Sequence, residues 1–272
     1  FMIVIAQVTN TSAVALFVAG FVPAATIMVC LMVLVYFRAR KYDWPVDTRP
    51  SVALITATAR KAAVPLVIPI VILGGFFLGV FTATESAAVA CVYAFLVTMF
   101  VYRDYRWRDL PKLIHRTVKT VAMVMMLIGF AAAFGYLMAL MQLPAKATAL
   151  LTAMTSDKIV MLFMINVLLL VLGTFMDMAP LILICTPILL PVVKSLGVDP
   201  VHFGMILLVN LGIGLITPPV GPTLFVGCAI GKVTMEEVSR ELWPFYGAMI
   251  VALGLITYVP ALSLWLPSML LK

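Results

Sequence analysis

Charged residues are scarce in this sequence of 272 residues. Lys, Arg, Asp and Glu together make up 11% of it, whereas soluble domains carry about 25%. Hydrophobic residues make up 64%. One soluble core could not bury this much apolar surface, so lipid must cover the remainder. The composition therefore excludes an ordinary soluble protein and predicts an integral membrane protein in contact with membrane lipid.

Motifs of enzymes and metal sites are missing as well. The four cysteines lie singly in apolar runs, without CxxC or Cys/His ligand spacing, so the sequence supports neither a disulfide framework nor a zinc site. HExxH, GxSxG and paired catalytic aspartates do not occur. Neither His115 nor His202 has a carboxylate and a nucleophile near it in the sequence. We therefore do not expect an enzyme.

The net charge is +7, and 12 of the 18 Lys and Arg residues are grouped in two loops. The first loop holds Arg38, Arg40, Lys41, Arg49, Arg60 and Lys61, and the second holds Arg103, Arg106, Arg108, Lys112, Arg116 and Lys119. Both loops flank long apolar runs, which is the positive-inside pattern of cytoplasmic connections. Tyr102, Tyr105 and Trp107 suit anchoring at the membrane interface better than base stacking, so we expect no nucleic acid.

Apolar runs of the length that crosses a membrane recur along the chain. About 20 apolar residues span the hydrocarbon, and ordinary spanning helices are predicted for 13–37, 121–143 and 244–266. Residues 64–81 and 85–102 predict two further crossings, because both loops that flank them are basic. Residues 51–62 end in Arg60-Lys61 and predict a short interfacial helix. The fold class is therefore all-α, with several spans.

Two shorter apolar stretches, 159–173 and 181–193, flank the bend Gly-Thr-Phe-Met-Asp-Met-Ala-Pro at 173–180. Stretches of about 13 to 15 residues reach only about 20–23 Å as helices, which is short of the hydrocarbon thickness. We predict a re-entrant helical hairpin with its tip near the middle of the membrane and its backbone shielded by protein.

A proline cluster interrupts the long apolar run 203–230. Pro218, Pro219 and Pro222 follow Thr217 closely, remove three backbone donors and block carbonyls one turn back. An unbroken helix is therefore not expected, and we predict two half-helices that meet at an unwound segment inside the membrane.

Counting crossings from the basic loops puts the turn 144–158 and Lys272 outside and the loop 232–240 in the cytoplasm. The chain then divides into four parts. They are 1–63, a spanning helix and cytoplasmic arm; 64–143, spanning helices with the second basic loop; 144–230, the hairpin and broken helix of a transport domain; and 231–272, a C-terminal spanning helix.

Two acidic residues, Glu85 and Asp177, fall within segments of membrane depth, and no Lys or Arg does. Such groups are costly and usually functional. Thr82-Ala-Thr-Glu85 matches a capping box, so a structural role is favoured for Glu85. Asp177 lies at the hairpin bend, where capping of the next helix and a role in transport are both open.

The pairing of a short hairpin with a proline-broken helix indicates ion chemistry. Unwound carbonyls at the middle of a membrane are oxygen ligands for sodium, and half-helix N-termini suit anionic substrates. The alternative is a proline kink that only shapes a helix. Gly173, Gly212, Gly214 and Gly221 could be packing glycines, although their clustering at the two breaks favours close backbone approach.

Four motifs, in this order, resemble the large membrane subunit of TRAP transporters, the DctM/SiaM family. They are GVFTATESAAVA (79–90), GTFMDMAPLILICTPILLPV (173–192), GVDPVHFG (197–204) and NLGIGLITPPVG (210–221). The resemblance covers nearly the whole chain. Many relatives have FTPTEA where this chain has Phe-Thr-Ala-Thr-Glu-Ser, so the helix break there lacks its proline.

The resemblance implies an elevator-type fold of two inverted repeats, of which this chain would hold the second half. The first residue is Phe1, and the opening segment resembles the point just after the first repeat, so we expect an N-terminal part to be missing. The family implies a bacterial inner-membrane protein that imports small organic acids such as C4-dicarboxylates, sugar acids or diketogulonate. Implied partners are a small four-helix membrane subunit and a periplasmic substrate-binding protein.

Site residues follow from the same motifs. The resemblance implies a sodium site, with Na⁺ as the coupling ion, at Gly173, Gly214, Thr217 and Val220. Candidates for substrate contact or gating are Asp177, Asn210, Pro218, Pro219, Gly221 and Glu85. The alternative function is a passive anion or cation channel, since hairpins and broken helices also build selectivity filters. A channel usually has rings of polar or charged residues along its pore, and this sequence lacks them.

Overall fold

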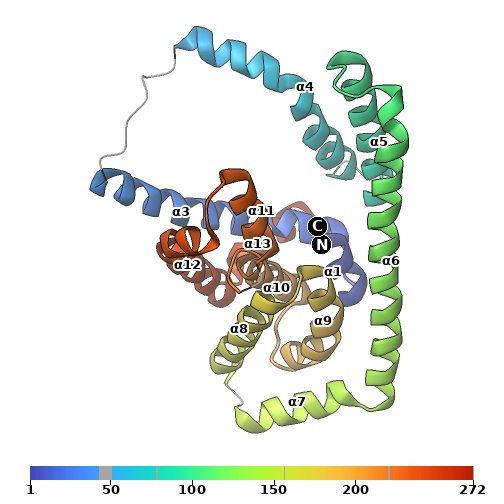
Figure 1. Cartoon of the computed structure of the whole chain (residues 1–272). Coiled ribbons are helices and arrows are strands. Elements are labelled where there is room, and N and C mark those ends of the chain that lie inside the picture. The colour runs from blue at the N-terminus through green and yellow to red at the C-terminus, as the bar shows by residue number, and fades with distance from the viewer. Residues whose placement is uncertain (43–50, 78, 156, 220, 272) are drawn as a thin grey trace. The chain divides into compact units, whose positions relative to one another are not determined.

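The computed structural model describes residues 1–42, 51–77, 79–155, 157–219 and 221–271, and the regular elements in these ranges are all helical (Figure 1). Seven helical segments in the described part are long and apolar enough to cross a membrane. The predicted all-α, multi-span class is therefore confirmed.

The chain forms two compact units, which are described separately. The second unit covers 44–126 and includes α4 (Val52–Phe77), α5 (Ala83–Leu96), the π-helical turn Val97–Val101, the 3-10 turn Trp107–Asp109 and the first part of α6 (Leu110–Leu140). The first unit covers the rest, and its helices are α1 (Met2–Thr9), α2 (Ala13–Ala19), α3 (Phe21–Lys41), the end of α6, α7 (Leu143–Met154), α8 (Lys158–Phe175), α9 (Met178–Ser195), α10 (Pro200–Gly214), α11 (Pro222–Gly231), α12 (Met235–Tyr258) and α13 (Ala261–Leu270).

In the second unit α4 packs against α5, and the Tyr93 hydroxyl donates to the Val64 carbonyl over 2.9 Å. The predicted capping box at the start of α5 is confirmed. Glu85 accepts from the Thr82 N–H at 2.7 Å, and Thr82 Oγ1 accepts from the Glu85 N–H at 3.3 Å. The prediction of a separate interfacial helix at 51–62 is wrong, because these residues form the first part of the longer helix α4. Pro65 removes only one backbone donor, which a membrane helix tolerates.

The core of the first unit lies where α8, α9 and α10 pack with α1 and α2. Each of the three longer helices begins at an aspartate whose carboxylate accepts from a backbone N–H. The Asp157 carboxylate accepts from the Ile159 N–H at 2.7 Å, that of Asp177 from the Met178 N–H at 2.9 Å, and that of Asp199 from the Val201 N–H at 2.7 Å. Negative charge at a helix N-terminus also complements the helix dipole. Local sequence therefore fixes where these helices start.

Three predicted boundaries in this unit are wrong. The legs of the hairpin, α8 and α9, have 18 residues each, or about 27 Å, because the helices run through the polar and glycine positions at their ends. The turn 144–158 contains a helix, α7. The single helix 244–266 is divided, since α12 ends at Tyr258 and Pro260 precedes α13. Both legs are long enough to cross a membrane, so the re-entrant arrangement stays a prediction.

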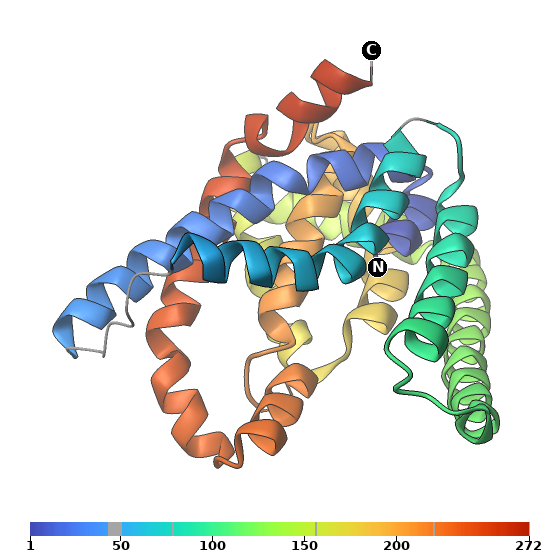
Figure 2. The ribbon, with the colours of Figure 1, turned by 90° about the horizontal axis from the view of Figure 1, so that it is seen from above.

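The predicted break in the last apolar run is confirmed. The chain leaves α10 after Gly214, passes through Leu215–Pro219 without regular structure, and enters α11 at Pro222 (Figure 2). The peptide bond between Pro218 and Pro219 is cis. We call residues 215–221 the break. Val220, which lies within it, is outside the described residues.

A polar network joins three helices inside the apolar core. Asn210 of α10 donates from Nδ2 to Asn166 Oδ1 of α8 at 2.5 Å, and Asn166 Nδ2 donates to Thr257 Oγ1 of α12 at 3.0 Å. The exposed fractions of these residues are 0%, 7% and 1%. A buried polar group is stabilised only when its hydrogen-bond partner lies within reach. The network therefore favours one alignment of α8, α10 and α12.

Replacement of Asn166 by Ala should therefore destabilise the protein. The change leaves Thr257 without its donor and Asn210 without one acceptor in a dry interior, a loss of about 1–3 kcal/mol. Thermal unfolding of the purified protein in detergent measures it. Thr223→Ala, at an exposed position, is the control and should have the same unfolding temperature as the wild type. Equal unfolding temperatures for all three proteins would contradict a structural role of the network.

Candidate functional site

Gly173 and Gly214 bring the hairpin and the broken helix into backbone contact. A Cβ atom placed on Gly214 would lie 2.6–2.7 Å from the Cα, C and O atoms of Gly173, and one placed on Gly173 would lie 3.3 Å from the Gly214 Cα. Both glycines are buried. Glycine is the only residue without a Cβ atom, so this close approach requires glycine at position 214 of α10. Two of the predicted sodium ligands therefore lie side by side.

The prolines of the break take away the helical donors of two carbonyls, and the structure supplies others. In a continuous helix the Gly214 and Leu215 carbonyls would accept from residues 218 and 219, which are prolines without N–H groups. Instead, Gly214 accepts from the Thr217 N–H at 3.0 Å, and Leu215 accepts from the Thr223 N–H at 3.2 Å. The break is thus a defined turn, held by its own backbone.

Gly221 closes this turn at the start of α11. Its φ angle is +35°, a conformation that side chains disfavour, and a Cβ there would lie 3.0 Å from the Thr217 carbonyl oxygen. Gly221 therefore allows the chain to fold back against Thr217, and the residue acts through backbone geometry.

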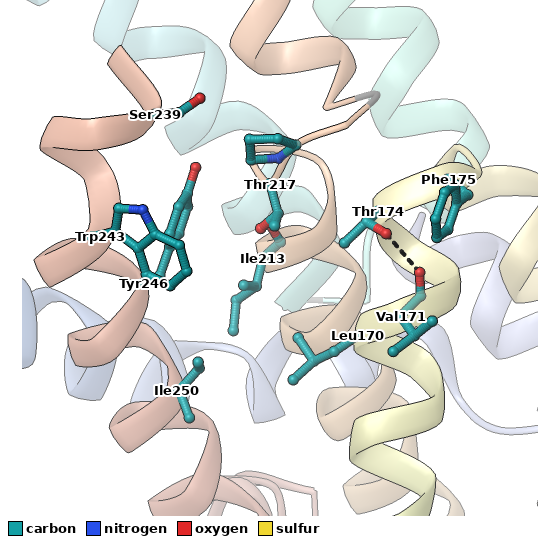
Figure 3. Close-up of a pocket in the computed structure, with 11 residues that line it drawn as sticks. Leu170, Val171, Thr174, Phe175, Ile213, Thr217, Ser239, Trp243, Tyr246 and Ile250 are labelled. Carbon is teal, nitrogen blue, oxygen red and sulfur yellow. Dashed lines mark hydrogen bonds between the residues drawn. The ribbon is translucent and has the colours of Figure 1, made fainter. Parts of the chain in front are cut away.

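A cavity of about 480 Å³ lies against the break within the first unit. Figure 3 shows residues of α8, α10 and α12 facing it. The lining residues are Leu170, Val171, Thr174, Phe175, Ile213, Thr217, Pro218, Ser239, Trp243, Tyr246 and Ile250. None of these carries a formal charge at neutral pH, so any polarity in the cavity comes from hydroxyl groups and from the Trp243 indole.

Each hydroxyl group on the cavity wall donates its hydrogen to a backbone carbonyl. Thr174 donates to the Val171 carbonyl (2.8 Å; dashed in Figure 3) and Thr217 to the Ile213 carbonyl (2.7 Å). In the same way, Ser239 donates to Met235 (2.6 Å) and Tyr246 to Ile216 (2.7 Å). A hydroxyl that donates to a carbonyl keeps its oxygen lone pairs. These four hydroxyl groups therefore present acceptors to a ligand, which suits a cation and does not suit a carboxylate.

The structure gathers only part of the predicted site. Gly173, Gly214, Thr217, Pro218 and Gly221 lie around the break, and Thr217 and Pro218 also line the cavity. The other candidates lie elsewhere or outside the described residues. Asp177 is exposed and caps α9, Asn210 is buried in the polar network, Pro219 is exposed, Glu85 caps α5 in the second unit, and Val220 is not among the described residues.

Sequence reasoning missed Tyr246, Trp243, Ser239 and Asn166. The first three reach the cavity from α12, and no local pattern links that helix to a break about 30 residues earlier. Asn166 had one available signal, since a lone amide within the apolar run of α8 needs a buried partner.

Comparison with known proteins places this architecture among transporters. The family model described as "Tripartite ATP-independent periplasmic transporter, DctM component" matches residues 1–262. A "C4-dicarboxylate TRAP transporter large permease protein DctM" of Pseudomonas aeruginosa is 40% identical and covers 99% of this chain and 63% of the relative. A "Sialic acid TRAP transporter large permease protein SiaM" of Vibrio cholerae is 34% identical, with coverage of 99% and 63%.

A third relative is named an "Isethionate TRAP transporter permease protein DctMQ", from Oleidesulfovibrio alaskensis. It is 38% identical to this chain, and the match covers 92% of the chain and 40% of the relative. The chain therefore spans less than two thirds of the length of these curated relatives.

Substitution of Gly214 by Ala tests the close approach of α8 and α10. The new Cβ would fall within 2.7 Å of Gly173 backbone atoms, so the helices must separate, at a cost of about 1–3 kcal/mol. Gly212→Ala is a matched control on the same helix, because a Cβ there meets nothing within 4 Å and Ala favours a helix.

Thermal unfolding in detergent should show a lower midpoint for Gly214→Ala and an unchanged or higher midpoint for Gly212→Ala. The same midpoint for both variants would mean that the two helices do not meet at this pair of glycines.

Proposed function

Because the chain belongs to the DctM component family of tripartite ATP-independent periplasmic transporters, we propose that it forms a sodium-binding transport region of a secondary transporter for small organic acids. Members of this family are transport proteins and not enzymes, and the seven candidate spans fit a multi-pass protein of the bacterial inner membrane. Since the chain spans less than two thirds of its curated relatives, substrate, coupling ion and partners are parts of the proposal.

The observation that carries the proposal is the backbone contact of Gly173 with Gly214 next to the break. Sodium prefers oxygen ligands, and interrupted helices supply backbone carbonyls for it inside membranes. The proposed ligands are the carbonyls of Gly173, Gly214 and Val220 with the oxygen of Thr217. Thr217 already donates its proton to Ile213, so its oxygen can face an ion only as an acceptor, as a cation requires.

A small organic anion is the proposed substrate. The relatives are named for C4-dicarboxylates, sialic acid and isethionate, which are all organic anions at neutral pH. No Lys or Arg is among the residues that line the cavity beside the break, so none there can pair with such an anion. Bound sodium and the positive end of α11, which starts at the break, are the available sources of positive potential. Binding of sodium and substrate would then be linked.

The proposed partners are those that the family name implies. A periplasmic substrate-binding protein would deliver the substrate, and a small membrane subunit would complete the complex. The alternative of a passive channel has less support, because the matching family consists of transporters and the cavity wall lacks charged residues.

Replacing Thr217 by Val tests the sodium site. Valine keeps the branched shape and removes the oxygen, so the sodium concentration for half-maximal uptake should rise several-fold. Substrate affinity at fixed sodium should fall through reciprocal linkage. The assay is uptake by the full-length complex in vesicles, with its binding protein, as a function of sodium.

Thr223→Val is the control, because Thr223 is exposed and only its backbone N–H takes part in the break. Superimposable sodium curves for the wild type and Thr217→Val would falsify the site. Uptake by the wild type without any sodium gradient or sodium requirement would remove sodium coupling from the proposal.

A further inference from the structure

Tyr246 of α12 reaches the break from outside it. Its hydroxyl donates to the Ile216 carbonyl at 2.7 Å, across a sequence separation of 30 residues. The side chain is 7% exposed, and its ring lies edge-on to Trp243 with centroids 6.2 Å apart. Figure 3 shows both rings on the α12 side of the cavity, opposite the break. The contact is therefore a partly buried hydrogen bond between two separate segments.

The peptide unit between Ile216 and Thr217 is held on both of its polar atoms. Its carbonyl oxygen accepts from Tyr246, and its N–H group, which belongs to Thr217, donates to the Gly214 carbonyl at 3.0 Å. A peptide unit is planar, so bonds to its oxygen and its nitrogen fix the orientation of the whole plane. That plane sets the position of the Thr217 Cα, and with it the direction of the Thr217 hydroxyl.

Without Tyr246 the Ile216 carbonyl would lose a donor in a region where water is scarce. The neighbouring carbonyls of Gly214 and Leu215 are already paired with backbone N–H groups of Thr217 and Thr223. A buried carbonyl without a partner is unfavourable, so the peptide plane would turn to find another donor. The Thr217 oxygen would turn with it.

We propose that Tyr246 is a positioning residue for ion binding, because it holds the peptide plane that precedes Thr217, one of the proposed ion ligands. The inference rests on the sodium site proposed above and adds a residue from α12 to it. Tyr246 does not touch the ion. It preorganises the site, so that less conformational entropy of the ligand residue is lost when the ion binds.

Tyr246→Phe removes only the hydroxyl and keeps the ring against Trp243. The sodium concentration for half-maximal uptake by the full-length complex should rise about threefold to tenfold, the range expected from one lost hydrogen bond. Maximal uptake at saturating sodium should be retained, because sodium binding can restore the orientation of Thr217. A purely structural role would lower maximal uptake and leave the sodium dependence in place.

Tyr258→Phe is the matched control. Tyr258 lies on the same helix, and its hydroxyl also donates to a backbone carbonyl, that of Ile159, at 3.3 Å. That bond is exposed and far along α12 from the break, so removing it should leave the sodium curve unchanged. The pair of variants separates loss of a tyrosine hydroxyl in general from loss of the one at the break.

A second measurement is independent of sodium coupling. A single cysteine at the buried Leu224, which is 5% exposed and lies against Gly221, in an otherwise cysteine-free full-length protein without sodium, reports how readily the break opens through its rate of reaction with a maleimide. The rate should rise when Tyr246→Phe is added and stay constant with Tyr258→Phe. If wild-type uptake does not respond to sodium, the proposed sodium site fails, while this labelling still decides whether Tyr246 holds the break.

Two results would overturn the inference. One is a labelling rate that is the same with and without the Tyr246 hydroxyl, since the break would then not depend on it. The other is a faster labelling rate together with an unchanged sodium curve, since Tyr246 would then hold the break without positioning an ion ligand.

Discussion

Inside a membrane every backbone carbonyl and N–H group needs a partner, and the break at 215–221 is the place where this requirement is hardest to meet. Pro218 and Pro219 remove two donors, and the structure answers with bonds from Thr217, Thr223 and the hydroxyl of Tyr246. The close approach of Gly173 and Gly214, the left-handed Gly221 and the contact with α12 all lie at these bonds.

Features that depend on a few neighbouring residues could be predicted from the sequence. The break was visible because prolines lack the N–H that a helix needs, and the start of α5 because a threonine and a glutamate three residues later form a capping box. The meeting of Gly173 with Gly214 was also anticipated, from glycines clustered at two interruptions and from the family resemblance. In each case the signal lies in the residue type itself.

The exact ends of helices and the contacts between distant helices were not predicted. Hydropathy does not locate the ends of α8 and α9, since capping by Asp157 and Asp177 extends them beyond their apolar runs. The division of α12 from α13, where Pro260 precedes α13, and the helix within 144–158 were also missed. In the polar network Asn166 and Asn210 are 44 positions apart in the sequence. Ile216 and Tyr246, which meet at the break, are 30 positions apart. No local pattern encodes such pairs.

The hydroxyl groups on the cavity wall also bear on which ion can drive the protein. Carboxylates bind protons as well as metal ions, so a site built from them changes its occupancy as the environment acidifies. Threonine and serine hydroxyls do not titrate in the physiological range, and tyrosine titrates only near pH 10. A wall of Thr174, Thr217, Ser239 and Tyr246 therefore offers no side chain that takes up or releases a proton in that range. For the proposed sodium-driven transport, hydroxyl groups in place of carboxylates would make ion binding at this wall insensitive to a proton gradient.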